Sequence, residues 1–155
     1  MAPDFAAIPL ARRAVASWLD ENGATPMAAD DVLLVLSELL TNAVRASIAD
    51  GTAVRLRIAD ADAGFCITVA DRGPGFAVRG SSADPFRDGG RGLPVVREIA
   101  TELDIRRRAN GWTVVNAVVA HAATPEPTPS SGGAAGFSAR AAKRIRRPGS
   151  ALSAL

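Results

Sequence analysis

The sequence has one cysteine, one histidine and no long apolar run, and each scarcity excludes a class of protein. A single cysteine, Cys66, leaves no partner for an intramolecular disulfide and no thiolate metal site. Because it lies in the alternating apolar segment FCITVA, we predict that Cys66 is a small buried hydrophobic residue. No apolar run approaches the roughly 18 residues of a membrane-spanning helix. The N-terminus lacks the basic-then-apolar order of a secretory signal, so we expect a cytoplasmic protein.

Charge is unevenly distributed along the chain. Residues 122–155 hold five Lys/Arg and one acidic residue, a net charge of +4, and the whole chain has +2, so residues 1–121 carry −2. A mildly acidic body with a basic tail lacks the basic face of a nucleic-acid-binding fold. We therefore expect no direct binding to nucleic acid and none to membranes.

The C-terminal part of the sequence has the composition of a disordered segment. At 155 residues the chain is long enough for one domain with a core, but too short for two of ordinary size. Residues 124–135 read TPEPTPSSGGAA, which offers too few large apolar side chains to offset the entropy of ordering. We predict one domain over residues 1–121 and a disordered Pro/Ser/Gly/Ala-rich basic tail over residues 122–155.

The pattern of apolar residues predicts three helices and four strands. The predicted helices cover residues 10–20, 28–48 and 93–100, and the predicted strands cover residues 54–59, 65–70, 103–108 and 112–120. This order lacks the alternation of strand and helix that defines a Rossmann domain. It predicts an α+β fold, a two-layer sandwich whose mixed, mostly antiparallel sheet is covered on one face by helices.

The longest predicted helix is apolar over most of its surface but carries one polar stripe. The stripe consists of Ser37, Glu38, Thr41, Asn42 and Arg45, which recur at spacings of three and four. Ser, Thr and Asn are weak helix formers, so their presence favours the lining of a site over the alternative, a solvated helix face. Glu38 and Asn42, one turn apart, supply a proton acceptor and a hard oxygen ligand suited to a water-rich Mg²⁺ ion.

Two glycine-rich segments follow the predicted hairpin. In DRGPGF, Asp71 ends a strand and can accept a hydrogen bond from the exocyclic amine of adenine, although a plain turn is the alternative. In GGRGLPVV, Gly90 and Gly92 directly precede a helix, and free backbone N–H groups with the helix dipole would bind an anion there. The P-loop pattern and a G-x-G-x-x-G after a strand are both missing, so those two nucleotide folds are excluded.

Together, the segments SELLTNAVRAS, DRGPGF and GGRGLPVV resemble the N box and the two glycine boxes of the GHKL ATPases, which include gyrase, the heat-shock chaperone, histidine kinases and MutL. The resemblance covers about residues 8–120 and implies that ATP and Mg²⁺ are cofactors. Within it, Asn42 resembles the Mg²⁺ ligand, Glu38 the catalytic carboxylate and Arg45 a basic residue near the phosphates. The remaining nucleotide-binding positions that it implies are Asp71 at adenine, Gly73 and Gly75 in the first glycine box, Gly90, Arg91, Gly92 and Leu93 in the second, and Thr113, which helps to hold adenine through water.

Among the branches of that superfamily, the short stand-alone form and GRGL before a helix resemble the anti-sigma-factor serine/threonine kinases. The resemblance implies partner switching with an anti-anti-sigma-type protein and a sigma factor. A homodimer is one assembly that we consider, and the sequence does not determine the oligomeric state. Two features depart from this branch: Ala46 stands where it often has histidine, and ADPFR at residues 83–87 is similar to a box of histidine kinases. Two alternatives stay open, a nucleotide-gated module that sequesters a sigma-like factor and a detached histidine-kinase catalytic subunit. We expect the one histidine, His121, to be a surface residue and not a phosphate acceptor.

Overall fold

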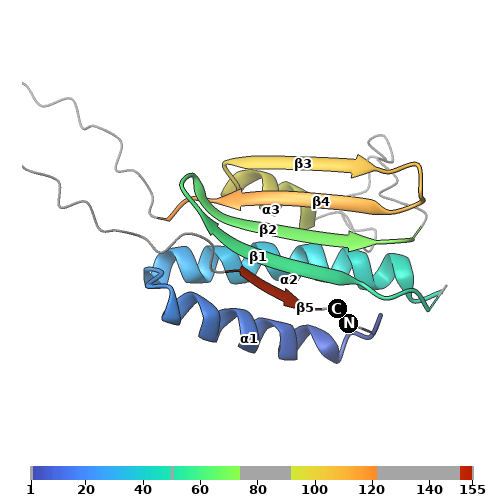
Figure 1. The fold of residues 1–155 in the computed structure, drawn as a ribbon, viewed down its shortest axis with the longest axis horizontal. Coiled ribbons are helices and arrows are strands. Elements are labelled where there is room, and N and C mark those ends of the chain that lie inside the picture. The colour runs from blue at the N-terminus through green and yellow to red at the C-terminus, as the bar shows by residue number, and fades with distance from the viewer. Residues whose placement is uncertain (1, 50, 74–91, 122–150, 155) are drawn as a thin grey trace, which may run out of the picture.

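The computed structural model describes residues 2–49, 51–73, 92–121 and 151–154, in which three helices cover one face of an antiparallel sheet (Figure 1). The helices are α1 (Ala7–Glu21), α2 (Pro26–Ser47) and α3 (Gly92–Ile99). The strands are β1 (Arg55–Ala61), β2 (Gly64–Asp71), β3 (Glu102–Arg107), β4 (Thr113–Val119) and β5 (Ala151–Ala154), in the spatial order β3-β4-β2-β1-β5. The predicted α+β two-layer fold is confirmed.

The central helix α2 begins where a cap and a proline coincide. The Thr25 hydroxyl accepts a hydrogen bond from the Ala28 N–H at 3.2 Å, and Pro26 occupies the first turn, where its missing N–H has no helical partner to lose. The helix therefore starts at Pro26, two residues before the predicted start at residue 28. Its apolar face is buried along its whole length by the residues Val32, Val35, Leu36, Leu39, Leu40, Ala43 and Val44.

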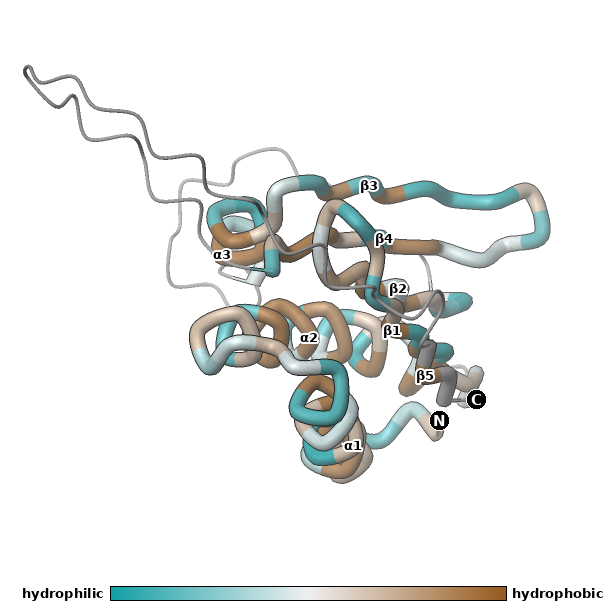
Figure 2. Tube along the Cα trace, turned by 60° about the vertical axis from the view of Figure 1, so that its left-hand side comes forward, coloured by the Kyte–Doolittle hydropathy of each residue, from teal (hydrophilic) through white to brown (hydrophobic). Residues whose placement is uncertain are grey.

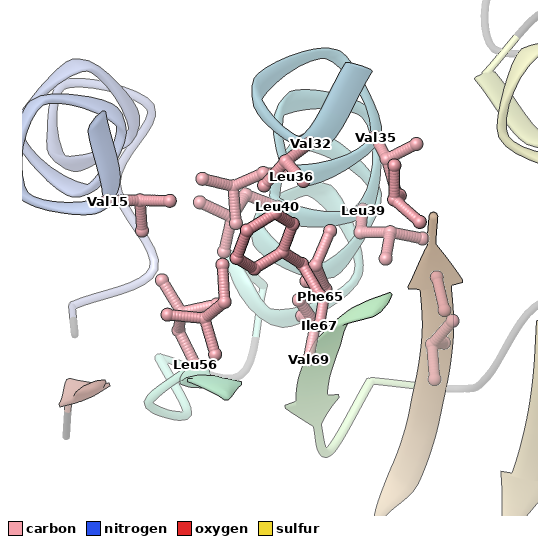
Figure 3. Packing of buried hydrophobic residues seen from close by; sticks show 14 of the residues in the cluster. Val15, Val32, Val35, Leu36, Leu39, Leu40, Leu56, Phe65, Ile67 and Val69 are labelled. Atoms are coloured by element: carbon pink, nitrogen blue, oxygen red, sulfur yellow. The ribbon is translucent and has the colours of Figure 1, made fainter. Parts of the chain in front are cut away.

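The core lies between α2 and the middle strands. Side chains alternate along β2, so Phe65, Ile67 and Val69 point toward the helices and pack against Leu36 and Leu40 (Figure 3). Helix α1 packs on α2 and reaches β5, while α3 packs on α2 and β3. Figure 2 shows the hydrophobic residues concentrated between the helices and the sheet. In the described part of the chain, no helix has both the length and the apolar character needed to cross a membrane.

The strand β5 corrects the predicted end of the ordered domain. The sequence predicted that the domain ends at His121 and that residues 122–155 form a disordered tail. Residues 151–154 instead pair antiparallel with β1, with Ala154 opposite Leu56 and Ala151 opposite Ala59. The four-residue segment has no periodicity of its own to reveal a strand; its structure comes from the unpaired edge that β1 offers. Residues 122–150 lie outside the described residues.

Two single-residue predictions are also corrected. Cys66 lies on the open face of the sheet and is only partly buried, because Phe65 and Ile67 occupy the inward positions of the alternation. His121 is not a surface residue: its side chain is 20% exposed, its Nε2 lies 2.5 Å from Asp60 Oδ1, and its ring meets the edge of Phe65 at 4.8 Å between centroids.

Candidate functional site

The last residue of β2, Asp71, and the first residue of β4, Thr113, lie next to each other on the helix-facing side of the sheet. Asp71 and Thr113 are register partners in these adjacent strands, and each is only 2% exposed. They alternate in phase with the buried Val69 and Val115, which directs both side chains inward. Within the described residues, Thr113 Oγ1 has no hydrogen-bond partner. A buried hydroxyl in this state is costly unless a ligand or water satisfies it.

The Asp71 carboxyl group is buried with few donors around it. Its Oδ1 accepts one hydrogen bond, at 2.9 Å, from the backbone N–H of Gly73. Burial raises the pKa of Asp71 above its ordinary value, while the Gly73 N–H and the Arg107 guanidinium act in the opposite direction. Acceptor capacity is therefore left on a charged group that faces the orphaned Thr113 hydroxyl. A ligand with N–H donors could satisfy both the Asp71 carboxylate and the Thr113 hydroxyl.

The backbone after β2 passes directly over α2 at Gly73. A Cβ atom at Gly73 would lie 2.5 Å from the Cβ and 2.5 Å from the carbonyl oxygen of Ala46, so only glycine allows this approach. The small side chain of Ala46 contributes to the same fit. On the other side, the Arg107 guanidinium donates to the Gly73 carbonyl at 3.3 Å. Gly73 is thus held between α2 and β3.

The start of α3 lies against the polar stripe of α2. A Cβ atom at Gly92 would collide with Glu38 Oε2 and would lie 3.4 Å from Asn42 Nδ2. The backbone of the first helical residue therefore contacts both side chains, which are themselves partly buried. The N–H groups of a first helical turn have no partner within the helix and attract negative charge. The carboxylate, the carboxamide and the helix N-terminus together form one polar centre.

The predicted stripe divides into two parts with different tasks. Ser37 does not face the site: it donates to the Leu33 carbonyl at 2.5 Å and accepts a hydrogen bond from Arg12 of α1, which also donates to Leu33. This corrects the prediction that Ser37 lines the same surface as Glu38, and it reflects the rotation of about 100° between successive helical residues. Arg45 is exposed in the last turn of α2.

Helix α2 connects the two halves of the site. It contacts Gly92 through Glu38 and Asn42 and contacts Gly73 one turn later, through Ala46. Figure 1 shows that the C-terminal ends of β2 and β3 and the start of β4 lie at the same end of the sheet, above the C-terminal half of α2. Four elements far apart in sequence thus bring together six of the predicted residues: Glu38, Asn42, Asp71, Gly73, Gly92 and Thr113.

Leu93, another predicted position, directly follows Gly92 in the chain. Leu93 is partly buried in the first turn of α3. The predicted site residues Gly75, Gly90 and Arg91, and the segment 83–87, lie outside the described residues. Sequence reasoning missed Arg107, although the alternation of β3, which turns Leu103 and Ile105 inward, would have placed residue 107 on the same side.

Comparison with known proteins bears on this arrangement. The family model described as histidine kinase-like ATPase domain matches residues 1–118. No individually curated protein gives a match. The matched range contains every site residue described above and ends within β4, before the segment that forms β5.

Proposed function

This chain belongs to the histidine kinase-like ATPase domain family, a family of ATP-binding domains, and we propose that it is an Mg²⁺-dependent protein kinase that phosphorylates a serine of an anti-anti-sigma-type partner. Such a kinase would regulate transcription by partner switching, in which the partner or a sigma factor is released. The observation that carries the proposal is the contact of the Gly92 backbone with Glu38 and Asn42. It brings a proton acceptor to a helix N-terminus suited to phosphate.

At the adenine end, the Asp71 carboxylate accepts a hydrogen bond from the exocyclic amine of the base. The Thr113 hydroxyl, which is buried beside it without a partner in the described chain, binds a water molecule shared with the base. Guanine presents an oxygen at the position of that amine and would repel the carboxylate. This pair therefore selects adenine nucleotides over guanine nucleotides.

At the phosphate end, the residues present fit an Mg²⁺ ion that keeps most of its water. A hard amide oxygen from Asn42 is available after a half-turn of its carboxamide, and Glu38 offers a second oxygen one turn away. Bound there, Mg²⁺ would neutralise charge on the phosphates. Positioning of the phosphates is the task of the α3 backbone, because the N–H groups of its first turn have no partner within the helix. The absence of a side chain at Gly92 leaves room for the Glu38 carboxylate beside them.

Glu38 is the proposed proton acceptor. Its carboxylate takes the proton of the partner's serine hydroxyl as that oxygen bonds to the γ-phosphorus, while the bond from phosphorus to the β–γ bridging oxygen breaks and ADP leaves with that electron pair. The contact with Gly92 supports this role, because it holds the carboxylate beside the N-terminus of α3. His121 takes no part, since it is held by Asp60 and Phe65.

Labelled ATP distinguishes this reaction from the alternatives. The full-length protein would be incubated with ATP labelled at the γ-phosphate, Mg²⁺ and an anti-anti-sigma protein from the same genome, followed by an acid wash. We expect label on the partner that survives acid, because phosphoserine is acid-stable. Acid-labile label would instead identify a detached histidine-kinase subunit. Tight Mg·ATP binding without transfer would identify a nucleotide-gated binding module.

A further inference from the structure

The face of the sheet turned away from the helices carries a cluster of arginines at the same end as the candidate site. Arg55 and Arg57 are exposed at alternate positions of β1, and Arg106 is exposed on β3. Arg55, the first residue of β1, and Arg72, the residue after β2, both contact Trp112: their guanidinium groups lie 4.4 Å and 5.2 Å from its ring centroid. We call Arg55, Arg57, Arg72, Arg106 and Trp112 the arginine face.

Most of this positive charge has no counter-charge in the described part of the chain. Asp104 pairs with Arg106 at 2.8 Å, and both side chains are exposed. No ion pair with a described carboxylate is formed by Arg55, Arg57 or Arg72. Stacking on an indole ring orients a guanidinium while leaving its N–H edge free for a bidentate carboxylate. Neighbouring like charges repel one another, so a bound anionic group would relieve that cost.

We propose that the arginine face is a docking surface for an acidic segment of a partner protein, with Trp112 as its centre. The Asp104–Arg106 pair is an example, within the chain, of a carboxylate held on this face. The surface backs directly onto the nucleotide site, because Arg72 follows Asp71 and Trp112 precedes Thr113 in the sequence, with the side chains on opposite faces. The proposal goes beyond the proposed kinase reaction and stands whether or not phosphate is transferred.

A protein segment fits this surface better than a nucleic acid or a membrane. Bases bind single-strand sites by stacking on free aromatic rings, whereas the Trp112 ring is already contacted by two guanidinium groups. Residues 1–121 also carry a net charge of −2, which opposes a long polyanion but not a few local carboxylates. Among the described residues, the large exposed hydrophobic side chains that would enter a membrane lie outside the sheet; they are Phe5, Leu10, Met27, Leu34 and Ile48.

Binding of a labelled oligoglutamate peptide tests the proposal on the full-length protein without nucleotide. Fluorescence anisotropy would be measured at low ionic strength and during a salt titration, for the wild type and for the double variant Arg55→Glu/Arg72→Glu. We expect salt-sensitive binding that the double variant weakens by about tenfold or more, since each substitution replaces attraction with repulsion. The matched control is Arg13→Glu, an exposed arginine on α1, whose affinity should stay within about twofold of the wild type.

Two further arms keep the test decisive. If the double variant does not melt cooperatively, Arg57→Glu replaces it, because the Arg57 side chain is exposed and forms no ion pair with a described residue. Oligothymidylate of equal charge is the competing probe. The proposal is overturned by peptide binding that is unchanged in the charge-reversal variants, by no binding at low ionic strength, or by tighter binding of oligothymidylate through the same arginines.

Discussion

Substitution of Gly92 by alanine separates the function of the α3 N-terminus from its stability. The new methyl group would collide with Glu38 Oε2 and would lie 3.4 Å from the Asn42 amide nitrogen, close to ordinary van der Waals contact. Because the colliding oxygen is the far end of a flexible side chain, Glu38 can swing away at little cost. Overpacking of a rigid core costs about 1–3 kcal/mol. Here we expect about 1 kcal/mol or less, partly offset by the better helix propensity of alanine, which amounts to about 0.5–1 kcal/mol in a helix interior.

The functional loss from Gly92→Ala should be larger than the loss of stability. Displacing Glu38 from the phosphate end by about 1 Å is expected to lower kcat/KM for phosphoryl transfer by about 100-fold. Thermal melting and steady-state kinetics would be measured on the same preparation. Glu38→Asp, whose shorter side chain removes the clash, is the partner in a double-mutant cycle: the double variant should recover the stability but not the activity. Wild-type kinetics in Gly92→Ala would refute the placement of Glu38 at the reacting phosphate.

Three further variants test the adenine end of the site and the strand β5. Asp71→Asn should weaken ATP binding by roughly 1.5–3 kcal/mol in calorimetry, because it removes a charged acceptor, and unchanged affinity would exclude an adenine contact. Burial raises the pKa of Asp71 in the folded state. The stability that the protonated Asp71 contributes is therefore complete below the unfolded-state pKa and is lost as the pH rises through the folded-state pKa. Asp71→Asn should accordingly raise the melting temperature at neutral pH. Arg107 opposes that shift, so Arg107→Gln should move the acid limb of the ATP-binding profile to higher pH, and an unmoved limb would contradict the assigned interaction. Deletion of residues 151–155 should lower the free energy of unfolding by about 1–2 kcal/mol, because β5 and the partly buried Leu152 are lost. ATP affinity should not change, because two strands separate β5 from β4. Loss of ATP binding in a protein that still melts cooperatively would contradict this expectation.

Local patterns predicted the elements of the fold because each has a strong period or a strong punctuation. The spacing of their apolar residues predicts both the burial of α2 and the alternation of β2. Asn110 and Gly111 lie in the turn that joins β3 to β4, where Gly111 has φ 83°, and Asn-Gly is a pair typical of such turns. Helix ends shifted by a few residues because caps such as Thr25 act through side-chain hydrogen bonds that the periodicity does not show.

Tertiary contacts account for what the sequence could not predict. Ser37 and Glu38 are neighbours in one polar stripe, and only the position of α1, through Arg12, assigns Ser37 to a helix contact. The strand β5 depends on the unpaired edge of β1, which lies almost a hundred residues earlier. In FCITVA, one phase consists of the large apolar residues Phe65, Ile67 and Val69, and the other contains Cys66 and the polar Thr68. The alternation therefore favours an outward Cys66, and the prediction of a buried thiol was wrong because it followed the apolar character of the whole segment and not its phase.

The most direct test of the central claim is the effect of Glu38→Gln on binding and on phosphoryl transfer, measured separately. The substitution keeps the volume and most of the polarity of the side chain beside Gly92 while it removes the proton acceptor. If Glu38 is the general base, Mg·ATP affinity in calorimetry should stay within a few-fold of the wild type, while single-turnover transfer to the anti-anti-sigma-type partner should fall by roughly 10²–10⁴. Transfer at the wild-type rate would contradict the claim, and parallel losses of melting temperature, affinity and rate would show that Glu38 is structural.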